Sequence, residues 1–419
     1  MAPVNSNLRS VEWLNFFLAD VQTGLGPFLA AYLASSGWNA GSVGYALTFG
    51  GLVTVALQTP AGAVVDSARN KRLLLAVAMT VLVCGAILLM GHASPVAVYS
   101  AQALIGGAGP FLLPTVAAIT LGIIGAGSFD RQFGRNQAFN SAGNVFTALL
   151  VALLAYKFGY RAIFLTAALF TVPAAISLLA IDGNQIDYAA ARGGCKDQHA
   201  TGAESVFVLA KDKVLLAFLF ASTLFHLANA AMLPELGEML SQGHPRAAAP
   251  FMSACVITTQ LVIAVSAAWI GKSAGLHGRK SLLLLGFGVL PFRGFLYTLL
   301  HHTGALIAVQ TLDGVANAIF GIVSILVIKD LTEGTGRFNL AAGALATMVG
   351  IGAALSNTVG GLLVQHFSYR ASFLGLASIA VVAFALLLVA VPETLPPERV
   401  PSTAFPVPAV ADGGRLSNP

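Results

Sequence analysis

The chain has 419 residues, of which 57% are hydrophobic and 9% are charged, and its net charge is +5. Soluble domains have about 25% charged residues, so this chain has too few charged side chains to cover a water-facing surface. The composition excludes an ordinary soluble protein and predicts an all-α protein embedded in a lipid bilayer. The positive charge does not indicate nucleic-acid binding, because the basic residues lie in short loops between apolar runs.

Twelve apolar segments are long enough to cross a membrane, which takes about 20 residues of helix. They are expected at 11–34, 42–65, 73–91, 95–124, 136–156, 161–181, 213–240, 247–271, 280–300, 304–329, 340–365 and 370–391. The first segment contains Asn15, Asp20 and Gln22. It is therefore predicted to be an uncleaved span rather than a signal peptide, whose apolar core would be cleaner.

The segments divide into two groups of six. We expect an N-terminal six-helix half at 1–181, a cytoplasmic linker at 182–212, a C-terminal six-helix half at 213–391 and a disordered tail at 392–419. Of the 22 Lys and Arg residues, seventeen lie on the side of the linker and termini, four lie on the other side and one lies within a span. The excess of positive charge on the cytoplasmic side of membrane proteins places both termini in the cytoplasm.

An internal repeat relates the two groups. A short charged turn at 62–72 has a second copy at 271–280, and the two leading glycines are 209 residues apart. The segments 158–164 and 367–373 match at the same offset. Equal copies with an even number of spans predict parallel repeats, related by an axis along the membrane normal.

These features resemble the major facilitator superfamily over about residues 10–395, with Gly-x-x-x-Asp-x-x-Gly-Arg-Lys-like turns after spans 2 and 8. The resemblance implies twelve helices in two six-helix bundles and a transporter that works by alternating access. The two turns depart from the family pattern at three positions. Arg69 and Asn70 stand where the first turn of the family has Gly and Arg, and Gly275 stands where the second turn would have Asp.

The resemblance also implies a cytoplasmic gate in which Asp66 interacts with the basic residues of its own turn and with a helix of the other half. The gate residues are Gly62, Asp66, Arg69, Lys71, Arg72, Gly271, Gly278 and Arg279. The alternative is that the basic residues only set topology. Because only the first copy keeps the acid, it is expected to carry most of the latch, and the second copy is expected to act mainly as a turn and topology signal.

Asp20 lies about ten residues into the first span and so near the middle of the bilayer. Ionisable side chains there are costly and usually face a cavity or a partner. We expect Asp20 to bind a proton or a cation, with a structural hydrogen-bonded carboxylate as the alternative. His226 and Asn229 share a face of the seventh span, where His226 either contacts substrate or only packs.

The expected proton-coupling and substrate cavity contains Asn15, Asp20, Gln22, Thr23, Gln102, Asn144, His226, Asn229, Gln310 and Asn317. Each of these polar residues could instead form hydrogen bonds between helices. Glu235 and Glu238, near the outer end of the seventh span, are expected to be solvated. No metal and no cofactor are predicted. Asp20 and His226 could be metal ligands, but two ligands are too few for a site, and the three cysteines are scattered along the chain.

Arg293 and Asp313 lie at similar depth on neighbouring spans, about eight residues before and nine residues after the turn at 301–304. We therefore expect a buried ion pair within the second half. Its favoured role is to fix the packing of the two helices. Removing one member of such a pair would be costly, because it leaves an uncompensated buried charge.

The sequence thus predicts a secondary active transporter that exports a small solute and couples this export to the movement of protons. The alternatives are a proton-coupled or facilitative importer and a non-transporting sensor or scaffold of the same fold. No enzyme is expected, since no nucleophile–base or metalloprotease spacing occurs in the spans. The expected partners are a small-molecule substrate, protons and the lipid bilayer, and no nucleic-acid partner is expected. The protein is expected to be a monomer in a bacterial inner membrane.

Overall fold

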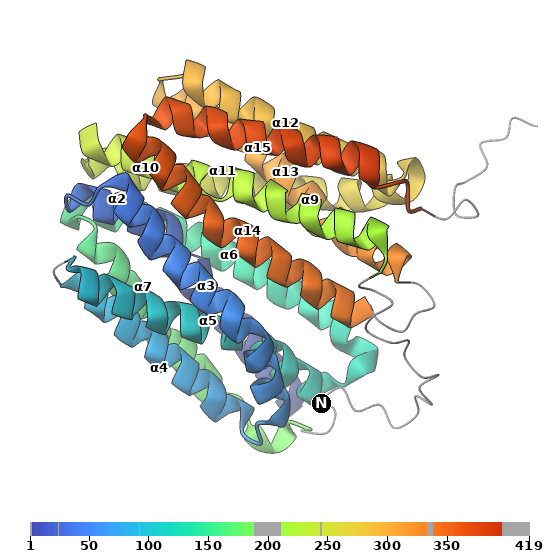
Figure 1. The fold of residues 1–419 in the computed structure, drawn as a ribbon. Coiled ribbons are helices and arrows are strands. Elements are labelled where there is room, and N and C mark those ends of the chain that lie inside the picture. Colours follow the sequence, from blue (N-terminus) through green and yellow to red (C-terminus); the bar gives the residue numbers. More distant parts are fainter. Residues whose placement is uncertain are drawn as a thin grey trace, which may run out of the picture.

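The computed structural model of the chain describes residues 2–23, 25–91, 93–187, 211–243, 245–332 and 338–395. These residues form α-helices and one short 3-10 turn (Figure 1). Most of the expected linker and the tail beyond residue 395 lie outside the described residues.

The first group of helices comprises α1 (Ala2–Thr23), α2 (Leu25–Ser35), α3 (Ala40–Ser67), α4 (Lys71–Met90), α5 (Pro95–Ile124), α6 (Ala126–Phe158) and α7 (Arg161–Leu179), followed by the 3-10 turn η1 (Gly183–Gln185). The second group comprises α9 (Lys213–Asn229), α10 (Met232–Gly243), α11 (Pro245–His277), α12 (Arg279–Leu299), α13 (Thr303–Leu331), α14 (Phe338–His366) and α15 (Tyr369–Ala390).

Short polar side chains begin several of these helices by accepting hydrogen bonds from otherwise unpaired backbone N–H groups. Asn39 accepts from Ser42 at the start of α3, and Asn70 accepts from Leu73 at the start of α4. Ser94 and Ser368 do the same for α5 and α15. The turns between the apolar runs are therefore fixed by local capping.

Eleven stretches of the described chain are long and apolar enough to cross a membrane. They correspond to the second to twelfth expected spans, with α9 and α10 together forming the seventh. The first expected span, 11–34, coincides with the end of α1 and all but the last residue of α2, and residue 24 between them lies outside the described residues. Alone, α2 has 11 residues, and α1 carries polar and charged residues such as Arg9 and Glu12, which lower its hydropathy.

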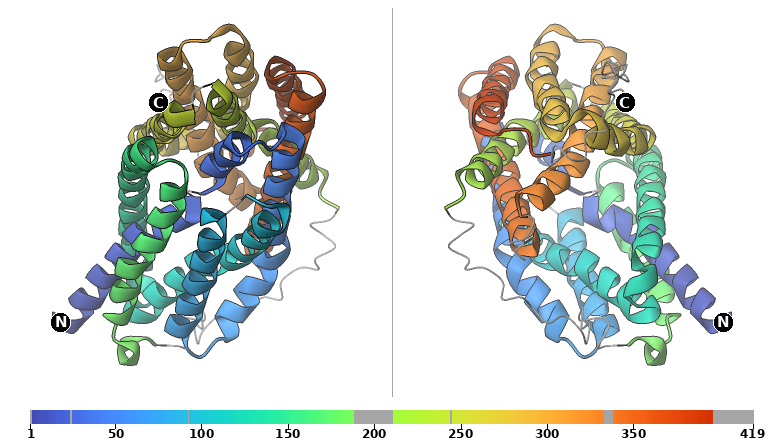
Figure 2. Two further views of the ribbon diagram at one scale, coloured as in Figure 1. Left: turned by 90° about the vertical axis from the view of Figure 1, so that its left-hand side faces the viewer. Right: turned by 90° about the vertical axis from the view of Figure 1, so that its right-hand side faces the viewer.

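The helices pack around two apolar cores. One core gathers side chains from α1 to α5 and from α7. The other gathers side chains from α9 to α15 and also Phe28, Val151, Ala155 and Ile163 of the first group. Figure 2 shows the two groups on opposite sides of the molecule, in blue to green and in yellow to red. Large apolar side chains such as Val265 and Val389 are exposed, as expected for a surface that faces lipid.

The main helix pairs that join the groups are α3 with α14, α6 with α11 and α2 with α10, and α2 also touches α11. We call the end of the bundle that carries residues 182–187 the linker end, and the end that carries residues 36–39 the far end. Thr48 donates to the carbonyl oxygen of Ala354 at 2.6 Å and accepts from the hydroxyl of Thr358 at 2.8 Å. Gly44 and Gly361 allow close approach of α3 and α14 nearer the far end. These identified contacts hold the two groups together in the far half of the bundle.

Candidate functional site

A cavity of about 790 Å³ lies between the two groups of helices. It receives side chains from α3, α4 and α5 on one side and from α9, α10, α12, α13 and α14 on the other. Its polar lining residues are Thr54, Gln58, Gln102, Asn229, Arg293, Asp313, Asn317 and Asn357. A volume of this size suits a small-molecule ligand.

The charged centre of the cavity is the Arg293–Asp313 pair, with Arg293 Nη1 at 2.6 Å from Asp313 Oδ1. Arg293 is 1% exposed and Asp313 is 7% exposed. Arg293 Nε also donates to the hydroxyl of Tyr297 at 2.9 Å, and Thr259 donates to Asp313 Oδ2 at 3.1 Å. The ion pair expected from the sequence is thus formed, and further hydrogen bonds offset the cost of burying its charges.

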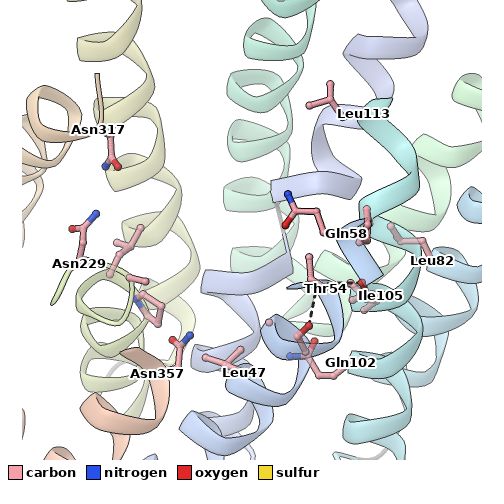
Figure 3. Close-up of a pocket in the computed structure, with 18 of the residues that line it drawn as sticks. Leu47, Thr54, Gln58, Leu82, Gln102, Ile105, Leu113, Asn229, Asn317 and Asn357 are labelled. Atoms are coloured by element: carbon pink, nitrogen blue, oxygen red, sulfur yellow. Dashed lines mark hydrogen bonds between the residues drawn. The ribbon is translucent and has the colours of Figure 1, made fainter. Parts of the chain in front are cut away.

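Two asparagines flank this pair. Asn229 Oδ1 accepts a hydrogen bond from Arg293 Nη1. Asn317 Nδ2 donates to Asp313 Oδ1 at 2.9 Å and to the Asp313 carbonyl oxygen at 3.0 Å. Asn229, Asn317 and Asn357 lie on one side of the cavity in Figure 3, facing Gln58, Thr54 and Gln102.

The opposite wall is held together by side-chain bonds to the backbone. Gln102 Nε2 donates to the carbonyl oxygen of Ala46 at 3.0 Å, and Thr54 donates to the carbonyl oxygen of Gly106 at 3.1 Å. Both bonds link α3 to α5. A Cβ at Gly50 would lie 2.6 Å from Gln102 Nε2, so glycine is needed there to let Gln102 cross between the helices.

Of the cavity residues expected from the sequence, Gln102, Asn229 and Asn317 line the cavity. Asp20, Gln22 and Thr23 belong to α1, but their side chains lie outside the described residues.

Asn15, Asn144 and Gln310 were also expected at the cavity and are not among its described lining residues. Asn15 donates to the carbonyl oxygen of Val11 and Asn144 donates to Asn140 Oδ1, so both amides are used within their own helices. Gln310 is 0% exposed. A polar residue in a span can meet several neighbours, and the packing of the helices decides which of them it meets.

His226 packs between aromatic rings. Its ring lies 4.7 Å from the ring of Phe320 and 5.2 Å from that of Phe225, edge-on in both cases. It is not among the described lining residues of the cavity. This position favours the packing alternative for His226.

Thr54, Thr259 and Tyr297 were not expected at the site from the sequence. Hydroxyl residues are frequent in spans, where they often bond to their own helix, so no sequence signal separates them. Gln58 and Asn357 also line the cavity.

Glu235 and Glu238 are buried, contrary to the expectation that they are solvated. They are 2% and 4% exposed. Ser372 of α15 donates to Glu235 Oε1 at 2.9 Å, and a Cβ at Gly360 of α14 would lie against the same oxygen. The start of α10 at Met232 turns both carboxyl groups under α14 and α15, which the apolar pattern alone did not indicate.

A polar cluster at the middle of α1 was also unexpected. Glu12 is buried and accepts from Arg135 Nε and from Gln132 Nε2, each at 2.9 Å. Gln132 in turn donates to Asn136. The cluster joins α1 to α6. An acid early in the first span was its only signal in the sequence.

Comparisons with known proteins decide the family. The family model described as "Major Facilitator Superfamily" matches residues 13–290 and 214–417. The chain is 40% identical over 393 residues to "Uncharacterized MFS-type transporter" sequences from two strains of Mycobacterium tuberculosis, covering 92% of this chain and 93% of each relative. The chain belongs to the major facilitator superfamily. It is a multi-pass membrane transporter and not an enzyme, as its sequence predicted.

Solved structures share the fold of this superfamily member. The nucleoside transporter NupG matches with a TM-score of 0.76 at 17% identity, covering 91% of this chain and 98% of that chain. A peptide transporter POT matches with a TM-score of 0.72 at 15% identity, covering 91% of this chain and 94% of that chain. A D-xylose-proton symporter matches with a TM-score of 0.70 at 14% identity, covering 93% of this chain and 98% of that chain. The expected all-α fold of two six-helix bundles is confirmed.

The first charged turn of this transporter is tied to its own half. Lys71 is buried and donates to the carbonyl oxygen of Val65, and Arg72 Nη2 donates to the carbonyl oxygen of Leu179 at 3.2 Å. Arg69 is not among the buried residues, and the side chain of Asp66 lies outside the described residues. A Cβ at Gly62 would meet nothing within 4 Å.

The second charged turn does more than set topology, which corrects the expectation from the sequence. Arg279 is buried and pairs with Asp330 at 3.1 Å. Glu393 accepts from the backbone N–H groups of Arg279 at 2.8 Å and Lys280 at 3.1 Å. Gly278 has a φ of 91°. The segment after α15 therefore caps α12. Gly271, the first glycine of this turn, has open space around it, because a Cβ there would meet nothing within 4 Å. The sequence did not indicate this because Asp330 and Glu393 are distant along the chain.

Proposed function

We propose that this transporter is a secondary active transporter that moves a small solute by alternating access of its two halves around the cavity. The observation that carries the proposal is the position of the cavity. It lies between the halves, and the contacts of Thr48 with Ala354 and Thr358 hold the halves together on the far-end side. Alternating access requires such contacts to form at one end while the other end opens.

We assign the linker end to the cytoplasm, and the protein to a monomer in a bacterial inner membrane. The basic residues of both charged turns support this orientation. Arg72 and Arg279 lie at the linker end, at the starts of α4 and α12, and basic residues are in excess on the cytoplasmic side of membrane proteins. With this orientation, the structure represents a state closed toward the outside of the cell.

We assign coupling to protons through Asp20, because an acid near the middle of the bilayer is costly unless it has a function. Export is the proposed direction, as expected from the sequence. Uptake is the second candidate, and the likeness of the fold to that of a D-xylose-proton symporter supports it.

The test uses purified protein in proteoliposomes. A thermal-shift screen first selects solutes that stabilise the protein, and their uptake is then followed under pH gradients of either sign. Accumulation driven by a proton gradient, with a direction that reverses with the gradient, is expected for wild type. Asp20→Asn should lose accumulation against a concentration gradient. Full-rate accumulation in Asp20→Asn with an unchanged pH dependence would refute the assignment.

Alternating access has a test that needs no solute. Pairs of spin labels on α3 and α14, one pair at each end, report the two inter-helix distances in liposomes. We expect two populations in which one end is close when the other is apart. A single distance at each end under all conditions would favour the sensor or scaffold alternative. Asp66→Ala should shift these populations if the first turn acts as a cytoplasmic gate, and unchanged populations and turnover would refute that role.

A further inference from the structure

The Arg293–Asp313 pair determines how the two neighbouring amides are turned. Arginine has only N–H donors and a carboxylate has only acceptors. The amide of Asn229 must therefore direct its oxygen at Arg293, and the amide of Asn317 must direct its nitrogen at Asp313. Exchanging O and N in either amide would place like groups against each other, so the hydrogen-bond network fixes both orientations.

Each amide keeps its other end for the cavity. Asn229 Nδ2 and Asn317 Oδ1 form no hydrogen bond with the described residues, and neither atom is sealed from the cavity that both residues line. The wall formed by the second half therefore presents a donor from α9 and an acceptor from α13. The ion pair holds these two groups in place through its hydrogen bonds to Asn229 and Asn317.

The described lining of the cavity carries no net charge. Arg293 and Asp313 neutralise each other, and both oxygens of Asp313 already accept hydrogen bonds. The other polar lining residues are neutral amides and a hydroxyl. A charged solute would lose its hydration without gaining an opposite charge, which is costly.

The facing wall from the first half is largely apolar. Leu47, Leu82, Ile105 and Leu113 lie on that side in Figure 3, together with Gln58 and with Thr54 and Gln102, whose side chains donate to backbone carbonyl oxygens. A solute that fits both walls has one apolar face and one face that forms hydrogen bonds.

We propose that the cavity binds an uncharged solute that offers an acceptor to Asn229 and a donor to Asn317 along one face, as a sugar hydroxyl pair or a nucleobase edge does. This inference rests on the proposed function, because it names the substrate class of the same cavity. Sugars and nucleosides share the required chemistry, and the experiment distinguishes them.

The experiment measures thermal stabilisation and proteoliposome uptake for matched pairs of solutes. Uridine is compared with uridine monophosphate and with 3-methyluridine, which lacks the ring N–H donor. D-glucose is compared with D-glucuronate, D-glucosamine and its deoxy analogues. Neutral members of one series should stabilise the protein and be taken up, and the charged or donor-deficient analogues should bind about tenfold more weakly or worse.

Asn229→Leu and Asn317→Leu should each weaken binding of the preferred neutral solute by about tenfold. Thr171→Val is the matched control, since its hydroxyl donates to Ala167 within α7 and away from the cavity. The analogue series on wild type keeps the proposal testable if a variant fails to fold.

Three outcomes would overturn the inference: a charged analogue that binds as tightly as its neutral counterpart, full affinity in both asparagine variants, or no stabilisation by any neutral member of either series. The proposed function is judged separately by the spin-label distances. Alternation of the two ends with transport of a charged solute would retain the transporter and reject the neutral substrate class.

Discussion

Arg293 and Asp313 are joined at 2.6 Å across α12 and α13, and both line the cavity. The pair therefore has two consequences. It fixes the packing of two helices inside the second half, and it orients Asn229 and Asn317 toward the space between the halves. A buried ion pair that looks structural in the sequence thus also shapes the binding wall.

Breaking this pair should be costly. We expect Asp313→Asn to lower the free energy of unfolding by about 3–5 kcal/mol, because Arg293 would be left buried without a counter-charge. The double variant Arg293→Met with Asp313→Leu should recover much of the loss, since it buries no charge. Denaturant unfolding of the purified protein in detergent measures both. Equal stability of Asp313→Asn and wild type would contradict the role of the pair.

Gly278 and Gly271 form a matched pair for substitution. Gly278→Ala should destabilise the protein by at least about 1–3 kcal/mol, because its φ is 91° and a Cβ would collide with Glu393. Gly271→Ala should be neutral or stabilising by up to about 1 kcal/mol, since the site is helical and open. Thermal unfolding in detergent tests both. The assignment fails if the two variants behave alike.

Thr48→Val should favour opening of the far end. The change removes the bonds to Ala354 and Thr358 and leaves their polar atoms without this partner. The cost of about 1–3 kcal/mol corresponds to a shift of roughly 5- to 150-fold in the balance between the two states. Spin-label distances between α3 and α14 at the far end measure the shift. Thr80 is exposed, and its hydroxyl donates to Ala76 within α4, so Thr80→Val should leave the distances unchanged. A Thr48→Val distribution identical to that of this control would argue against the latch.

Two Glu→Gln changes should have different effects. Glu235 is buried, and its Oε2 has no partner among the described residues, so Glu235→Gln should keep or raise the melting temperature by removing a charge that burial disfavours. Glu393 accepts backbone N–H bonds on both oxygens, so Glu393→Gln should lose about 1–3 kcal/mol. Thermal unfolding of both variants at one pH tests this. A loss in Glu235→Gln as large as that in Glu393→Gln would show that the charged form of Glu235 is needed.

Much of the architecture follows from the sequence alone. Long apolar runs must form helices in a bilayer, because no water is there to satisfy the backbone. Runs such as 95–124 therefore became helices with the expected bounds. The first span is the least apolar of them, because its N-terminal part, α1, carries polar residues that weaken the apolar signal.

The sequence also determined which residues are costly to bury, and this singled out Arg293 and Asp313 before any contact was known. It did not determine what each amide faces. Asn317 lines the cavity, whereas Gln310, about two turns earlier on nearly the same face of α13, is buried at a different depth. Likewise, only the structure placed Glu235 beneath α15 and Glu393 over the start of α12. Hydropathy reports how much a side chain prefers water, but the partner it meets depends on helix rotation and on contacts between residues far apart in the chain, which only the tertiary packing decides.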